Sequence, residues 1–241
     1  LSEHSKVALI GAFAERPRFQ GAGSSQVHPT QVDTLRQALT DYLGDIEYAQ
    51  GYDPVASRPN QTLIIEAAAL AKRADVAVVY VGLPGIYESE GFDREHLDLP
   101  DQHTALITAV CAANPNTVVV LANGAPVTMP WLDQVPAVLE GYLGGQASGS
   151  GIADVLMGVQ NPAGKLAETF PLSLEDVPCT PFFPGENRQM QYREGIYVGY
   201  RYYDTARRNV LFPFGHGLSY TEFEYVEANT DNASLTVDGR I

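Results

Sequence analysis

The hydrophobic positions of this chain fall into five short runs separated by patterns of helical period. The runs are rich in β-branched residues, and several are continuous rather than alternating, which is typical of strands covered on both faces. The expected strands are residues 6–11, 45–50, 75–82, 116–123 and 136–144. This alternation of strand and helix predicts an α/β fold, with an open, mostly parallel, doubly wound sheet and helices on both faces.

Helix signals fill the segments between and after these strands. Apolar residues recur at helical spacing in residues 30–44, where Gly44 provides a C-terminal stop. The next helix is expected to open with Asn60 as its N-cap, and the third with Pro100 at its first helical position. A shorter helix is expected within residues 147–159.

The pattern changes after about residue 160, where Pro, Gly and aromatic residues become frequent and no helical period continues. This region predicts an extended, aromatic-rich C-terminal segment that packs against the sandwich and completes a domain of residues 1–220. Within it, residues 195–203 are expected to form a strand. Residues 221–241 alternate as strands do, so they predict the start of a further, truncated β-domain or a linker.

Composition narrows the class of protein. The formal net charge of the 241 residues is −14, from 15 Lys and Arg against 29 Asp and Glu, which disfavours nucleic-acid and anionic-membrane partners. No run of about 18 apolar residues occurs, so no membrane span is predicted. Cys111 and Cys179 make no disulfide framework, which favours a reduced, cytoplasmic compartment, although a secreted parent protein stays open. The chain enters its first strand almost at once, as a sequence cut at a domain edge would.

The histidines do not indicate a metal site. All five are scattered and lack ligand spacing with a carboxylate partner, so neither a metal nor another cofactor is expected. His96 and His103 flank the start of the third helix and are expected to lie at the surface.

The candidate chemistry lies in the loop after the third strand, because open parallel sheets bind ligands beyond the carboxyl ends of their strands. This loop has about 18 residues and contains YESEGFDR at 87–94. In an extended backbone Glu88 and Glu90 would point the same way and raise each other's pKa, so that one could act as a general acid. Arg94 would pair with Asp93 or with a glutamate. A solvated acidic loop explains the same residues equally well.

The glycine-rich segment at residues 21–25 is a second candidate for binding. It is followed by neither the Gly-Lys-Ser/Thr of a phosphate loop nor a dinucleotide fingerprint. Ser24 could donate a hydrogen bond to a ligand, and a role in stabilising the loop is at least as consistent with the sequence. A G-x-S-x-G nucleophile motif is also absent from the chain.

Six segments, in this order, resemble the C-terminal α/β-sandwich domain of family 3 glycoside hydrolases, the β-glucosidase family. They are residues 6–30, 88–100, 114–132, 141–171, 194–204 and 211–225. The resemblance implies retaining hydrolysis of a β-linked glucoside or related oligosaccharide at a pocket between two domains. It also implies that a (β/α)8 barrel of the same full-length protein supplies an aspartate nucleophile and the sandwich supplies a general acid/base glutamate. Family members often continue into a fibronectin-like β-domain, which fits residues 221–241.

The family's loop pattern, Glu-Gly-aromatic-Asp-Arg, matches this chain at Glu90, which therefore inherits the acid/base role. Glu88 lies outside that position and either tunes Glu90 or faces water. The resemblance also places Ser24, Arg18 and Gln20 near the sugar pocket as substrate-binding candidates, while Arg18 is equally suited to pair with an acid of the loop. A barrel needs about 250 residues of its own. The isolated chain is therefore expected to lack glycosidase activity.

Two other classes of function stay open. One is a non-catalytic carbohydrate-binding or regulatory module of the same fold. The other is a flavodoxin-like nucleotide binder, which the missing phosphate motifs disfavour. The aromatic residues of the C-terminal segment suit either a sugar-stacking platform or packing between strands and tail, and packing is favoured. They are Tyr197, Tyr200, Tyr202, Tyr203, Phe212 and Phe214.

Overall fold

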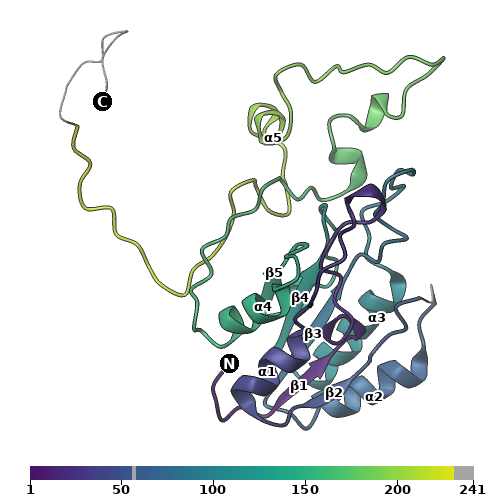
Figure 1. The fold of residues 1–241 in the computed structure, drawn as a ribbon. Coiled ribbons are helices and arrows are strands. Elements are labelled where there is room, and N and C mark those ends of the chain that lie inside the picture. Colours follow the sequence, from purple (N-terminus) through teal and green to yellow (C-terminus); the bar gives the residue numbers. More distant parts are fainter. Residues whose placement is uncertain (56–57, 231–241) are drawn as a thin grey trace.

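The computed structural model describes residues 1–55 and 58–230 and contains a five-stranded sheet (Figure 1). The strands are β1 (Val7–Ile10), β2 (Glu47–Ala49), β3 (Val76–Gly82), β4 (Thr117–Ala122) and β5 (Ala137–Glu140). All neighbouring strands pair in parallel, in the order β2-β1-β3-β4-β5. The expected α/β sandwich is confirmed, with strands somewhat shorter than the apolar runs.

The continuous apolar runs are explained by helices that cover both faces of the sheet. α1 (Leu35–Leu43) packs against α4 (Ser148–Leu156), and α2 (Gln61–Ala71) packs against α3 (Asp101–Ala113). The two pairs lie on opposite faces (Figure 1). The four residues of β1 are at most 3% exposed, and β3 is buried from its second residue onward. Burial of this kind contributes roughly 1.5–3 kcal/mol per large aliphatic side chain.

The helix starts follow the sequence signals, with one shift. The Asn60 side chain accepts hydrogen bonds from the backbone N–H groups of Thr62 (3.1 Å) and Leu63 (3.4 Å), so it is the expected N-cap. Pro100 is the N-cap of α3 rather than its first helical residue, because its ψ of 138° is extended. Asp101 is then the first helical residue, where the positive end of the helix dipole stabilises its carboxylate.

His103 is not the surface residue that the sequence suggested. It is fully buried, its ring centroid lies 4.1 Å from that of Tyr52, and its Nδ1 donates to the carbonyl oxygen of Gly82 at 2.9 Å. Burial lowers the pKa of His103 to about 3, against a smaller raising effect of the Gly82 hydrogen bond. The ring is therefore neutral and structural. The first turn of α3 faces the sheet, which the position of His103 near a helix start did not reveal.

The C-terminal segment forms no strand within residues 160–220, and most of its residues between 183 and 202 are exposed rather than packed against the sandwich. The predicted strand at 195–203 is wrong: the chain turns at Gly199 (φ 59°) and forms α5 (Tyr200–Ala206). Aromatic and β-branched residues favour a strand only where a neighbouring strand can pair with them. Within the segment, Phe170, which is fully buried in the core, forms a β-bridge with Phe212, which also packs against the core. Short 3₁₀ turns occur at Ala12–Ala14, Gly23–Ser25, Leu132–Gln134, Leu174–Asp176 and Thr180–Phe182.

The end of the described chain leaves the sandwich (Figure 1). Residues 221–230 are exposed and form neither helix nor strand. Residues 231–241 lie outside the described part, so the expected β-domain at 221–241 stays a prediction. Among the described residues, none of the helices is both long enough and apolar enough to cross a bilayer.

Candidate functional site

The loops that leave the carboxyl ends of β1, β3 and β4 meet at one edge of the sheet. In a parallel sheet these ends share an edge, which brings segments that are distant in sequence together. Ser24 and Glu90 touch across 66 residues of sequence, and Arg18 and Glu88 across 70. The edge that sequence reasoning selected as the ligand edge is thus where the acidic loop and the glycine-rich loop come together.

Glu90 is held by Ser24. The backbone N–H of Ser24 donates to Glu90 Oε2 at 2.8 Å, and the Ser24 hydroxyl donates to Oε1 at 2.6 Å. Gly23 makes this approach possible: its φ is +80°, and a Cβ there would lie 2.8 Å from Glu90 Oε2. The Glu90 side chain is otherwise exposed at the surface of the domain. Both candidate residues of the two loops therefore belong to one site.

The electrostatics of Glu90 are the reverse of what the sequence suggested. The Ser24 hydroxyl, followed by the Ser24 backbone N–H, lowers the pKa of Glu90, because both hydrogen bonds stabilise the carboxylate. Mutual raising by Glu88 was expected from an extended backbone. The loop instead turns at residues 85–91, which sends the two carboxylates to different partners.

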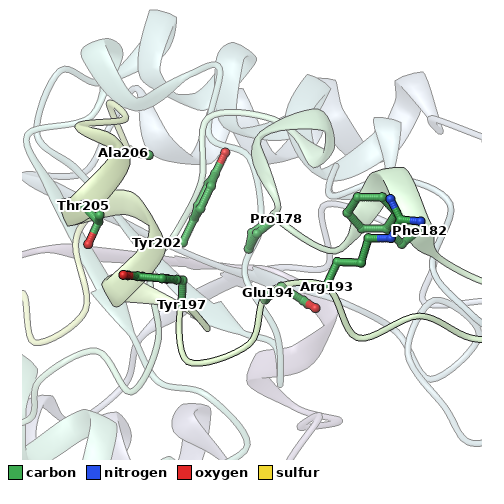
Figure 2. A pocket seen from close by; sticks show the side chains of 8 residues that line it. All are labelled: Pro178, Phe182, Arg193, Glu194, Tyr197, Tyr202, Thr205 and Ala206. Carbon is green, nitrogen blue, oxygen red and sulfur yellow. The ribbon is translucent and has the colours of Figure 1, made fainter.

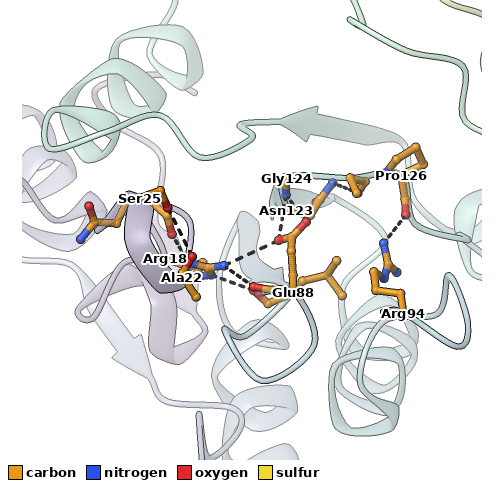
Figure 3. Close-up of polar contacts among 11 residues, drawn as sticks. Arg18, Ala22, Ser25, Glu88, Arg94, Asn123, Gly124 and Pro126 are labelled. Carbon is orange, nitrogen blue, oxygen red and sulfur yellow. Dashed lines mark hydrogen bonds and ion pairs between the residues drawn. The ribbon is translucent and has the colours of Figure 1, made fainter. Parts of the chain in front are cut away.

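Glu88 points toward the loop after β4. Its two carboxylate oxygens accept the Gly124 backbone N–H at 2.9 and 3.0 Å, and Arg18 Nη2 lies 3.8 Å from Oε2 (Figure 3). The side chains of Arg18 and Glu88 are 10% and 17% exposed. Glu88 therefore does not face water, and the alternative role for Arg18, pairing with an acid of the loop, is confirmed.

Arg18 and Gln20 engage other parts of the protein. Arg18 donates to the backbone carbonyls of Leu83 and Glu88, each at 3.2 Å, and to that of Gln20. Burial lowers the pKa of Arg18, and the charge of Glu88 opposes this. The Gln20 side chain exchanges two hydrogen bonds with the backbone of Val27, at 3.0 and 3.1 Å. Their predicted contact with substrate stays a prediction, and the geometry gives both side chains a role in shaping the loop.

A carboxyl that the sequence analysis missed lies beneath this edge. Glu140, the last residue of β5, accepts from the Tyr142 backbone N–H (2.9 Å) and from Asn123 Nδ2 (3.2 Å). Burial raises the pKa of Glu140 to about 8, and the charges of Glu88 and Glu168 add to the effect. A glutamate at the end of an apolar strand-like run was the available sequence signal. At neutral pH this group is mostly protonated.

Arg94 completes the polar layer on the other side of Glu88. It donates to the backbone carbonyl of Pro126 at 3.0 Å rather than to Asp93 or a glutamate (Figure 3). Burial lowers the pKa of Arg94, while Glu88, Asp98 and Glu168 oppose that. Burial, then the charge of Glu88, raises the pKa of Glu168. Within the described ranges, no group of three or more His, Cys, Asp or Glu side chains is arranged to hold a metal.

The C-terminal aromatic residues form a separate feature. A pocket of about 330 Å³ is lined by Pro178, Phe182, Arg193, Glu194, Tyr197, Tyr202, Thr205 and Ala206 (Figure 2). The other aromatic candidates pack on one another or into the domain: Tyr200 stacks on Phe214 with centroids 4.9 Å apart, and Tyr203 is buried. Packing into the domain therefore accounts for Tyr203 and Phe212, whereas Tyr197, Tyr200 and Phe214 are 39–48% exposed.

Comparison with known proteins bears on the family and the fold of this chain. The sequence profile of the glycosyl hydrolase family 3 C-terminal domain matches residues 1–220. The chain is 50% identical over 239 residues to a thermostable β-glucosidase B of Acetivibrio thermocellus, covering 98% of this chain and 32% of that protein. It is 42% identical over 240 residues to an exo-α-(1→6)-L-arabinopyranosidase of Bifidobacterium longum, covering 96% and 32%.

A solved structure is similar to this chain in both fold and sequence. The crystal structure of a family 3 β-glucosidase from Bifidobacterium adolescentis superposes with a TM-score of 0.87 at 44% identity, covering 91% of this chain and 32% of that one. The chain thus spans about a third of the length of the curated relatives named here. It belongs to glycoside hydrolase family 3, in which it is the C-terminal α/β-sandwich domain.

Proposed function

We propose that this domain supplies the general acid/base residue, Glu90, to a retaining β-glucosidase-like enzyme that hydrolyses O-glycosyl bonds. The nucleophilic aspartate would lie on a (β/α)8 barrel of the same full-length protein. The observation that carries the proposal is the position of Glu90, which is exposed at the carboxyl edge of the sheet and held by two hydrogen bonds from Ser24. A β-glucosidase and an arabinopyranosidase among the relatives support a glycosidase.

The proposed chemistry divides between two carboxyl groups. Retaining hydrolysis places them about 5–5.5 Å apart: one protonates the leaving oxygen, and the other attacks the anomeric carbon. Glu90 gives its proton in the first step and removes one from water in the second. An exposed carboxylate on a second domain suits this role, because it can reach a sugar that is already seated in a barrel.

The lowered pKa of Glu90 has a consequence for this mechanism. In the isolated domain Ser24 stabilises the charged form of Glu90, whereas a general acid must hold a proton. A barrel carboxylate close by, and the loss of solvent when a sugar fills the site, both act to raise that pKa. Glu90 would therefore gain acid character only when the two domains enclose a substrate.

The test is Glu90→Ala in the full-length enzyme. Loss of a general acid should reduce kcat/KM by about 10²–10⁴-fold for substrates with poor leaving groups, and far less for activated aryl glycosides. Azide should restore turnover of the activated substrates by replacing the missing base in the second step. Glu95→Ala, an exposed glutamate of the same loop, is the matched control and should leave the rates unchanged.

A uniform loss across leaving groups, or no loss, would reject the acid/base assignment. Unchanged hydrolysis together with altered binding of oligosaccharides would instead favour a non-catalytic carbohydrate-binding or regulatory module. The two functions are therefore separated by the dependence of rate on the leaving group.

A further inference from the structure

Beneath the Glu90–Ser24 contact, three groups join the loops that follow β1, β3 and β4. We call them the Glu88 brace: the guanidinium of Arg18, the carboxylate of Glu88 and the backbone N–H of Gly124. Arg18 comes from the loop after β1 and donates to the carbonyls of Leu83 and Glu88 in the loop after β3. Glu88 then accepts the Gly124 N–H with both oxygens, which connects the loop after β4 (Figure 3).

The three groups of the brace lie close together and are largely shielded from solvent. The side chains of Arg18 and Glu88 are 10% and 17% exposed, and hydrogen bonds to a charged group in such surroundings are among the stronger ones in proteins. Gly124 has no side chain in the way, since a Cβ there would lie 2.9 Å from Glu88 Oε1. The positive charges of Arg18 and Arg94 both interact with the carboxylate of Glu88 across this layer.

The brace controls both partners of the contact above it. Glu88 precedes Glu90 by two residues, and Arg18 precedes Ser24 by six. The Ser24 hydrogen bonds fix Glu90 relative to the loop after β1 but leave that pair of loops free to shift together. The brace fixes the pair relative to the sheet, through Leu83 directly after β3 and Gly124 shortly after β4.

We infer that Glu88 is the positioning residue for Glu90, a role that rests on the function proposed above for Glu90. Glu88 touches neither substrate nor nucleophile in this scheme; it acts by holding the loop. Placement matters because a misplacement of about 1 Å can reduce the rate about 100-fold. Gln at position 88 would keep the shape, remove the charge, and turn an amide N–H₂ toward a site filled with donors from Arg18 and Gly124.

The test compares Glu88→Gln with Glu95→Gln in the full-length enzyme. If Glu88 positions Glu90, Glu88→Gln should lower kcat about 10–100-fold for poor leaving groups, and clearly less for activated ones, with Glu95→Gln unchanged. In a Glu90→Ala background, Glu88→Gln should add little, since nothing is left to position. Equal losses for all leaving groups, or full additivity with Glu90→Ala, would overturn the inference.

A second measurement on the 241-residue chain does not depend on catalysis. Hydrogen exchange at the backbone amides of Ser24 and Gly124 should be faster in Glu88→Gln than in Glu95→Gln. The Gly124 amide donates to Glu88 itself, and the Ser24 amide donates to Glu90, which the brace positions. Unchanged exchange at Ser24 would overturn the inference even if Glu90 is the acid/base. Conversely, faster exchange combined with a Glu90→Ala variant that shows no leaving-group dependence would support the brace and reject the proposed function.

Arg18→Lys provides a further variant if Glu88→Gln does not fold. It keeps the positive charge but loses the planar fork that reaches the carbonyls of Leu83 and Glu88. The same leaving-group dependence and the same faster exchange at Ser24 are expected. Rates and exchange equal to those of the unaltered protein would count against the brace.

Discussion

Glu140 links the pH dependence of stability to the polar layer under the site. The pKa of its carboxyl is raised to about 8 in the folded domain, mainly by burial, from an ordinary value of 4.5. Between these two values the folded state holds a proton that the unfolded state has released. The contribution of Glu140 to stability is therefore complete below about pH 4.5 and is lost as the pH rises toward 8.

The size of the effect follows from the two pKa values. From pH 4.5, the ordinary pKa, to pH 7 there are about 2.5 pH units over which the folded state keeps the proton and the unfolded state does not. Each pH unit corresponds to about 1.36 kcal/mol of folding free energy, which gives about 3 kcal/mol at pH 7. Since water reaches part of the residue, we expect about 2 kcal/mol. Glu140→Gln cannot titrate, so its stability relative to the unaltered chain should increase by about this amount between pH 4.5 and pH 7.

The assay is urea unfolding of both proteins at several pH values, analysed as the difference between their free energies of unfolding. The difference is needed because His103 acts in the opposite sense. Its folded pKa of about 3 is below the ordinary 6.5, so it reduces stability as the pH falls below about 6.5. A difference between Glu140→Gln and the unaltered chain that is constant from pH 4.5 to 8 would refute the reasoning.

Two further predictions concern the loop and the domain. Gly23→Ala should destabilise the chain by about 1–2 kcal/mol in thermal unfolding, because φ is +80° there. It should also move the Glu90 pKa, followed by NMR, back toward its ordinary value as the added methyl pushes Glu90 from Ser24. Gly85→Ala is the control, because its Cβ would make an ordinary 3.6 Å contact with Ala22, and equal effects of the two changes would contradict the explanation. The 241-residue chain alone should not hydrolyse a chromogenic β-glucoside, because the proposed nucleophile lies on another domain; measurable turnover would disprove this.

Much of the fold follows from local sequence. A strand buried on both faces must be apolar throughout, so β3 and β4 are visible as continuous runs, and Asn60 caps α2 through its own neighbours. The alternation of strand and helix predicts which edge of the sheet would bind a ligand, and the resemblance to the family's Glu-Gly-aromatic-Asp-Arg pattern makes Glu90 the candidate there. The strands and the helix cap depend on each residue's relation to its own backbone, which the order of residues records.

The partners at the site were decided by tertiary structure. Glu88 and Glu90 are two residues apart, yet one binds the loop after β4 and the other the loop after β1. A turn in the backbone sends them apart, and the packing of strands brings Ser24 and Gly124 within reach. The lowered pKa of Glu90 and the raised pKa of Glu140 follow from those contacts and from burial. Such quantities depend on which distant segments meet, so the spacing of residues along the chain does not contain them.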